Sequence, residues 1–334
     1  MSRNINWEFH RITVLGVILL LFPWIVFQPA SRTMQRTITL IGLFAILAIA
    51  LNIVFGHTDQ LVLFVGGMAA IGGYSTMLLA EYLAVSPWLT MLVGATLAGL
   101  VGCLVAYVSA RRGAGIIVIA ILTLALQFII IELINAYRGI TGGDTGYRVS
   151  ELTIEPLEAL PGFNDQIVLF YMIAALLLGM MLLYHYIMHS RIGLAFEMIR
   201  QDQDAARAIG IDVLRYKVMA AGIATFAMGM TGPLFGQRAG FLTPTTFDFG
   251  HVDVVVLIIL IVGGLRTLYG PLVGAIAIVF ISEELRQAGE YRSVIFGTLL
   301  IVLFLYFRSG IVPGLREQDQ KLGITRKYLP GTES

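Results

Sequence analysis

Residues 114–136 read AGIIVIAILTLALQFIIIELINA, and Glu132 is the only charged side chain in this stretch. A helix needs about 20 mostly apolar residues to cross a bilayer, so the stretch predicts a membrane-spanning helix. Comparable apolar runs recur, and the sequence therefore predicts about ten spans: 12–28, 35–55, 61–83, 88–110, 114–136, 166–188, 216–236, 252–265, 270–285 and 293–307.

The eighth and ninth runs, 252–265 and 270–285, are short for complete spans. Gly263, Gly264, Gly270 and Pro271 lie at or between their ends and favour a break in the helix. Irregular backbone at membrane depth is tolerated only inside protein or beside a water-filled cavity. We therefore expect these two runs to form broken or re-entrant helices.

The composition of the whole chain supports the same fold class. Of its 334 residues 57% are hydrophobic and only 13% are charged, and the mean hydropathy is +0.85. Soluble domains carry about 25% charged residues, so a soluble enzyme, a disordered chain and a fibrous protein are excluded. The prediction is an all-α integral membrane protein, a polytopic helical bundle.

The charge and the cysteine count exclude further classes of protein. The net charge of +1 excludes a nucleic-acid-binding protein driven by bulk charge. The single cysteine, Cys103, excludes a disulfide framework within the chain, and no Cys/His spacing predicts a metal site.

Lysine and arginine predict the orientation in the membrane. The first run is long for a signal peptide and contains Pro23 and Trp24, so we expect it to be retained. With ten alternating spans, 15 Lys and Arg residues fall on the cytoplasmic side and 7 outside. This bias predicts that both termini are cytoplasmic. The apolar runs together predict a single transmembrane domain over 1–315, followed by a cytoplasmic tail over 316–334. The long connection 139–165 then lies outside, and 189–215 lies inside.

The inner connection, 189–215, has the composition of a short amphipathic helix. It contains no proline, apolar residues recur at near-helical spacing, and Gly210 is typical of a helix end. Two interpretations stay open: a loop helix packed on the bundle, or a docking helix for a cytoplasmic partner. The apolar side holds residues 196, 199, 205, 206 and 209, and the polar side holds Glu197, Arg200, Asp202, Asp204 and Arg207.

The segment Asp204-Ala205-Ala206, followed after three residues by Gly210, resembles the EAA loop of bacterial ABC importer permeases. The flanking Ser190-Arg191-Ile192-Gly193 and Ile199-Arg200-Gln201-Asp202 resemble branched-chain amino acid permeases of the LivM type. The resemblance runs in order over roughly residues 40–315. Its other parts are Ile71–Tyr74, Thr141–Gly146, Gly240–Pro244, Val262–Leu265, Thr267-Leu268 and Gly270-Pro271.

This resemblance implies a function and a set of partners. The chain would be the permease subunit of an importer for branched-chain or related amino acids in the bacterial inner membrane. It would assemble with a second, LivH-like permease, two ABC ATPases and a periplasmic substrate-binding protein. The coupling helix, about 196–210, would contact an ATPase through Phe196, Ile199, Arg200, Asp202, Asp204, Ala205, Ala206 and Gly210.

The chain itself shows no means of hydrolysing ATP. It lacks the G-x-x-x-x-G-K-[ST] phosphate loop, so it is predicted to be no enzyme and to hold no cofactor. ATP and Mg would be bound by the partner ATPases. The glycines at 66, 67, 72 and 73 lie in an apolar run and favour close helix packing instead.

Three neutral polar residues are candidates for the substrate path. Thr123 and Gln127 lie one turn apart on one helix face, and Asn52 lies in the second run. Hydrogen bonds between helices are an equally weighted alternative for all three. Apart from Glu132 the interior shows few acids, which argues against an ion-coupled carrier.

The cargo is less defined than the class of transporter. The family element GQxSLGH corresponds to Asp59–Val65, where Val62 and Val65 occupy the Ser and His positions. The same machine could therefore carry urea, a short amide or another small organic solute. A secondary transporter is the alternative from another class. A membrane-embedded enzyme would need paired acids or histidines at one depth, and the sequence shows none.

Overall fold

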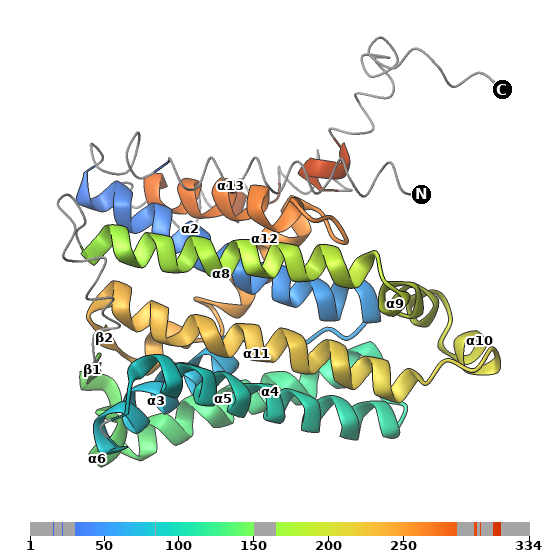
Figure 1. Ribbon diagram of the computed structural model, residues 1–334, viewed down its shortest axis with the longest axis horizontal. Coiled ribbons are helices and arrows are strands. Elements are labelled where there is room, and N and C mark those ends of the chain that lie inside the picture. The colour runs from blue at the N-terminus through green and yellow to red at the C-terminus, as the bar shows by residue number, and fades with distance from the viewer. Residues whose placement is uncertain are drawn as a thin grey trace, which may run out of the picture.

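The computed structural model describes residues 16, 22, 31–83, 85–149, 165–285, 297–298, 301 and 310–314. Long helices lie side by side in a bundle (Figure 1), which confirms an all-α membrane fold. The principal helices are α2 (Arg32–Leu51), α3 (Val65–Leu83), α4 (Pro87–Arg111), α5 (Ile116–Ala136), α8 (Asp165–Met188), α11 (Val213–Ala239), α12 (Asp253–Gly263) and α13 (Gly270–Glu284).

Within the described part of the chain, five helices are long and apolar enough to cross a membrane. They are Arg32–Gly56, Pro87–Arg111, Ile116–Ala136, Asp165–Met188 and Val213–Ala239. The runs 12–28 and 293–307 lie almost entirely outside the described residues, and the tail 316–334 lies wholly outside them. The total of about ten spans therefore stays a prediction.

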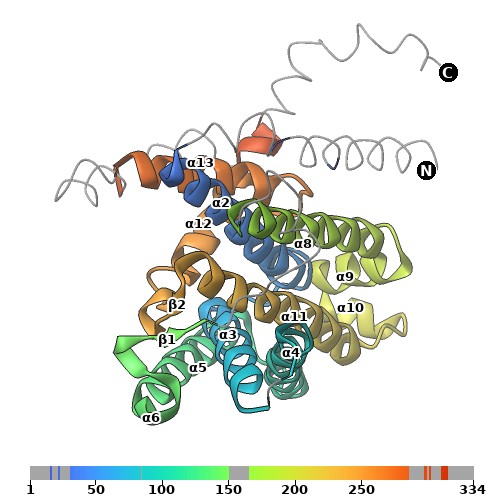
Figure 2. The same cartoon turned by 60° about the vertical axis from the view of Figure 1, so that its left-hand side comes forward.

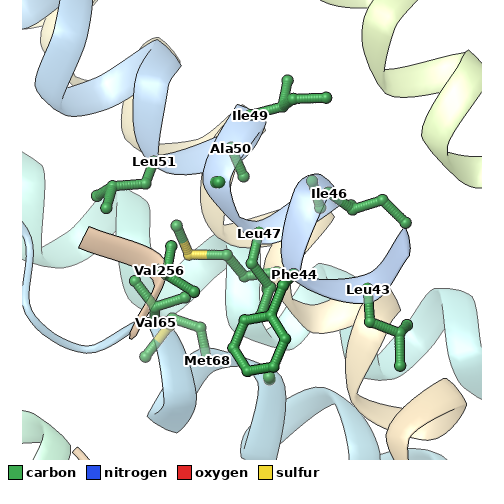
Figure 3. Packing of buried hydrophobic residues seen from close by; sticks show 14 of the residues in the cluster. Leu43, Phe44, Ile46, Leu47, Ile49, Ala50, Leu51, Val65, Met68 and Val256 are labelled. Carbon is green, nitrogen blue, oxygen red and sulfur yellow. The ribbon is translucent and has the colours of Figure 1, made fainter. Parts of the chain in front are cut away.

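Helix α2 forms the centre of the hydrophobic core. Every residue from Leu43 to Leu51 is buried, so this helix is covered on all sides and not on one stripe alone. Figure 3 shows Phe44 and Leu47 on the side of Val65 and Met68 at the start of α3 and of Val256 in α12, whereas Ile46 and Ile49 point to other sides of the helix. The helix continues into a π-helical turn at Asn52–Gly56.

Glycines bring α3 into close contact with α11. A Cβ on Gly72 would meet the carbonyl of Gly229, and a Cβ on Gly232 would meet the carbonyl of Ala69. Small residues let membrane helices approach closely enough for backbone van der Waals contact. The predicted packing role is confirmed for Gly72 and Gly73, because Gly73 lies against Gly232 in the same way.

Two breaks interrupt the regular helices. Helices α12 and α13 are separated by residues 264–269, and Gly264 adopts a φ of 115°. At 1.5 Å per residue the 11 residues of α12 extend about 16 Å, roughly half of a 30 Å hydrocarbon core. The predicted break between these helices is confirmed. The run 61–83 was expected to be one span, but α3 begins only at Val65.

The two ends of the bundle carry different structures (Figures 1 and 2). At one end the short strands β1 (Tyr147–Arg148) and β2 (Phe241–Leu242) pair antiparallel, next to α6 (Arg138–Thr141). At the opposite end lie α9 (Arg191–Gln201) and α10 (Gln203–Ala208). Following the predicted orientation, we call these the outer end and the inner end.

Candidate functional site

The inner segment consists of two short helices, whereas the sequence predicted one helix over about 196–210. Asp202 interrupts the helix because it adopts an extended conformation, with φ −158° and ψ 116°. Its carboxylate accepts hydrogen bonds from the backbone N–H groups of Asp204 at 2.8 Å and Ala205 at 3.0 Å. Asp202 is thus the N-cap of α10, a position that favours aspartate. These two bonds lower the pKa of Asp202.

The ends of both helices are fixed by local interactions. Ser190 caps α9 by accepting from the N–H of Ile192 at 3.2 Å. Gly210 follows the end of α10 with a φ of 87°, a conformation that glycine adopts without strain, so its predicted role as a helix terminator is confirmed.

Two ion pairs join neighbouring turns of the segment. Arg200 donates to Glu197 at 2.5 Å and lowers the pKa of that carboxyl. Arg207 donates to Asp204 at 2.7 Å.

The predicted coupling residues divide into a buried group and an exposed group. Phe196, Ile199 and Ala206 are at most 2% exposed, and the ring of Phe196 meets Tyr216 of α11 edge-on. Arg200 is half-buried. The exposed group consists of Asp202, Asp204, Ala205 and Gly210. The buried side chains attach the segment to the bundle, and the exposed group is open to a partner.

Sequence reasoning missed three exposed apolar side chains on this segment. Leu194 and Met198 of α9 are 58% and 45% exposed, and Ile209 after α10 is 67% exposed. The sequence had placed residues 205 and 209 on one apolar stripe with 196, 199 and 206, but both are exposed in the structure, because the break at Asp202 ends the α9 stripe before α10 begins. Leu194 and Met198 lie outside that stripe. Their place on the opposite side of the helix was the signal in the sequence that they would be exposed.

Thr123 and Gln127 come together on the buried face of α5, as predicted. Both side chains are fully buried, and each accepts from a backbone N–H group just before or within the first turn of α3. Thr123 accepts from the N–H of Leu63 at 2.9 Å. Gln127 accepts from the N–H of Gly67 at 2.5 Å and donates to the carbonyl of Phe247 at 2.7 Å.

Asp253 belongs to the same polar cluster and was not singled out from the sequence. Its side chain is 1% exposed, and its carboxyl accepts from the N–H groups of Val65 at 2.5 Å and Gly66 at 3.3 Å. The sequence led us to expect a membrane interior nearly free of charged residue types apart from Glu132, and Asp253 and Lys217, which is 3% exposed, depart from that expectation. The available signal was an acid at the second position of the run 252–265.

Asn52 lies in a separate polar contact nearer the inner end. Its amide accepts from the N–H of Arg266 at 2.9 Å and donates to the carbonyl of Thr267 at 3.1 Å. It also donates to the hydroxyl of Tyr184, which lies 2.7 Å from a ring nitrogen of His57. The structure thus gives all three predicted path residues protein partners, and Asn52 holds the break between α12 and α13.

At the outer end the structure pairs the long connection 139–165 with the segment that follows α11. Tyr147 pairs with Leu242 and Arg148 with Phe241, so parts of 139–165 and 238–251 form one surface. The remainder of the first segment, 150–164, lies outside the described residues.

Comparison with known proteins identifies the family to which this chain belongs. The profile of the family described as "branched-chain amino acid transport system / permease component" matches residues 33–304. The chain belongs to this family. The match includes the described helices α3 to α13, both helices of the inner segment and the polar cluster around Asp253.

Individual relatives agree with the family profile. The chain is 29% identical over 328 residues to the "high-affinity branched-chain amino acid transport system permease protein LivM" of Escherichia coli, covering 92% of this chain and 75% of the relative. It is 27% identical over 275 residues to the "probable branched-chain amino acid transport permease protein LivH" of Methanocaldococcus jannaschii, covering 78% and 82%. This family member is therefore a multi-pass membrane permease subunit.

Proposed function

We propose that this permease subunit imports branched-chain or related amino acids and is driven by ABC ATPases that contact α9 and α10. The observation that carries the proposal is the division of the inner segment into an attached side and an open side. Phe196 and Ile199 pack into the bundle, whereas Met198 and Asp204 face outward. A surface with both properties can receive a partner and transmit its movement.

The mechanism follows from how the segment is attached. The inner segment directly continues α8 and precedes α11, and Phe196 packs on Tyr216 of α11. Closure of the ATPases around ATP would displace α9 and α10 as a unit. The tight packing at Phe196 would pass that displacement to α8 and α11, because close-packed interiors transmit strain. The spans would reorient and open the path inward.

The proposal includes the remaining parts of the machine. ATP and Mg are bound by the two ATPases, and this chain is not an enzyme. A second permease of the LivH kind completes the membrane unit, consistent with relatives carrying both LivM and LivH names. A periplasmic binding protein delivers the cargo to the surface that contains β1 and β2. The complex lies in the bacterial inner membrane with both termini of this chain in the cytoplasm.

The test is ATP-driven uptake by the complete transporter with altered inner segments. We expect Asp204→Trp and Met198→Glu to abolish uptake of leucine and to lose the ATPases on purification, while the chain stays folded in the membrane. Leu104→Trp, at an exposed position of α4 far from the inner segment in sequence, is the control and should transport normally. Full uptake by both inner variants would overturn the coupling role, and uptake of urea without leucine would overturn the cargo.

A further inference from the structure

A cavity of about 610 Å³ lies on the side of the bundle, between α4, α8 and α11. Its lining is almost entirely apolar, and it opens on the surface, because Leu100 and Leu183 in the lining are 65% and 38% exposed. Gly179 of α8 helps to keep the cavity open, since a Cβ there would meet nothing within 4 Å. An apolar cavity that is open at membrane depth can accommodate an acyl chain.

Helices α4 and α11 pack antiparallel in a close register (Figures 1 and 2). Ala98 lies against Gly229 and Gly102 lies against Thr225, so each step along α4 corresponds to a step back along α11. Extended to the last residue of α4, this register reaches the first turn of α11. The inner end of α4 therefore lies beside the beginning of α11.

Each of these two helix ends carries an exposed arginine, Arg111 on α4 and Arg215 on α11. Arg111 follows Cys103 of the cavity lining by eight residues, and Arg215 precedes Gly222 of the lining by seven. Both intervals are about two helical turns, so both arginines lie on the cavity side of their helices. The cavity thus has two guanidinium groups beyond its inner end.

The depth of the two arginines corresponds to the lipid headgroups. Arg111 lies 12 residues from Gly99, and Arg215 lies 11 residues from Phe226, both of which line the cavity near the middle of their helices. At 1.5 Å per residue these separations are about 18 and 16 Å. Half of the hydrocarbon core is about 15 Å, so the cavity lies near the bilayer midplane and the arginines lie at its inner surface.

The two guanidinium groups are not neutralised by acidic side chains. Within the part of the chain that the structure describes, no carboxylate forms an ion pair with Arg111 or Arg215. Arg111 donates to the hydroxyl of Tyr107 at 2.7 Å. Asp212 is the nearest acid along α11, and it caps the helix by accepting from the backbone N–H of Arg215 at 3.0 Å. The side chains of both arginines can therefore receive an anion.

We propose that this cavity and the two arginines bind one anionic phospholipid of the leaflet at the inner end. Arg111 and Arg215 bind the phosphate, and one acyl chain extends between α4, α8 and α11 into the cavity. Guanidinium groups bind phosphate through paired N–H groups, and basic residues at this level favour lipids with a net negative charge. An apolar helix of a partner would fill the cavity but would leave both guanidinium groups without an anion.

The test is photo-crosslinking with lipids of defined charge. The permease, purified from native membranes with the subunits that accompany it, is reconstituted in vesicles of phosphatidylcholine and phosphatidylglycerol in equal parts. One of the two lipids carries a diazirine near the end of an acyl chain, and mass spectrometry locates the labelled residues. We expect phosphatidylglycerol to label the cavity more strongly than phosphatidylcholine. Glycerol 3-phosphate in solution should not compete, because it lacks the acyl chain.

The variants separate the charge from the cavity. Arg111→Gln and Arg215→Gln should each lower labelling by phosphatidylglycerol about fivefold, which is the effect of one basic residue near an anionic membrane surface. Gly179→Phe fills the cavity and should lower labelling by both lipids. Arg32→Gln, at the exposed start of α2 at the outer end, and Ile117→Phe, on the exposed face of α5, are the matched controls and should change neither.

Three outcomes would overturn the site. The first is equal labelling of the cavity by the two lipids, and the second is labelling by phosphatidylglycerol that survives both arginine replacements. The third is an unlabelled cavity beside a labelled α5, which would show that a partner subunit covers this face. The inference does not depend on which solute the permease carries, so none of these outcomes bears on the proposed transport.

Discussion

Replacing Asp253 with alanine should destabilise the chain more than replacing any exposed aspartate. The change removes the acceptor of the N–H groups of Val65 and Gly66 at the start of α3. An unsatisfied buried donor costs about 1–3 kcal/mol, so two would cost about 2–6 kcal/mol. The bond to Gly66 is long at 3.3 Å, which places our expectation near 3 kcal/mol.

Two companion variants make this prediction specific. Asp253→Asn keeps one carbonyl acceptor for Val65 and should cost only about 1 kcal/mol. Asp144→Ala removes an ion pair with Arg138 whose side chains are 63% and 70% exposed, and such pairs contribute about 0–1 kcal/mol. The stability of each purified, detergent-solubilised variant is measured by its thermal unfolding midpoint. An Asp253→Ala midpoint equal to that of Asp144→Ala would refute the role of this carboxyl in holding α3.

Three further predictions concern glycines and one ion pair. Gly72→Ala should cost at least about 1–3 kcal/mol by overpacking against Gly229, whereas Gly179→Ala, which meets nothing within 4 Å, should be neutral by thermal midpoint. Gly210→Val should lower the free energy of unfolding by about 1–2 kcal/mol, because residue 210 has a φ of 87°, and Gly210→Asn should lower it less. Equal thermal midpoints for these two variants would contradict this prediction. The ion pair with Arg200 lowers the pKa of Glu197, so the pair stabilises the fold above the ordinary pKa of a carboxyl and is lost as the pH falls through the lowered pKa. The free energy of unfolding of Glu197→Gln should therefore differ from that of the wild type by less than about 1 kcal/mol at neutral pH, and the difference should vanish in acid.

Much of the fold could be predicted because apolar runs and glycines report local constraints. The run 114–136 became α5, and Gly263, Gly264 and Pro271 indicated the break between α12 and α13. Thr123 and Gln127 were correctly placed on one face, because helical spacing alone decides that. Such features depend on neighbours within a few residues.

The contacts across the bundle could not be predicted from spacing. Gln127 binds Gly67 and Phe247, which lie 60 and 120 residues away in the chain. Asp253 lies at the second position of the apolar run 252–265, and only the fold shows that it meets the start of α3. The break at Asp202 was missed because its neighbours are good helix formers, whereas its side chain binds the backbone of the next turn.

We have proposed that ABC ATPases drive this permease through α9 and α10. The direct measurement is purification of the tagged chain from native membranes after crosslinking through Asp204→Cys in a Cys103→Ala background, with mass spectrometry of what accompanies it. We expect two ABC ATPases and a second permease to accompany the chain, with the crosslink from position 204 on an ATPase. A chain that emerges alone, or as a homodimer without an ATPase even after crosslinking, would contradict it.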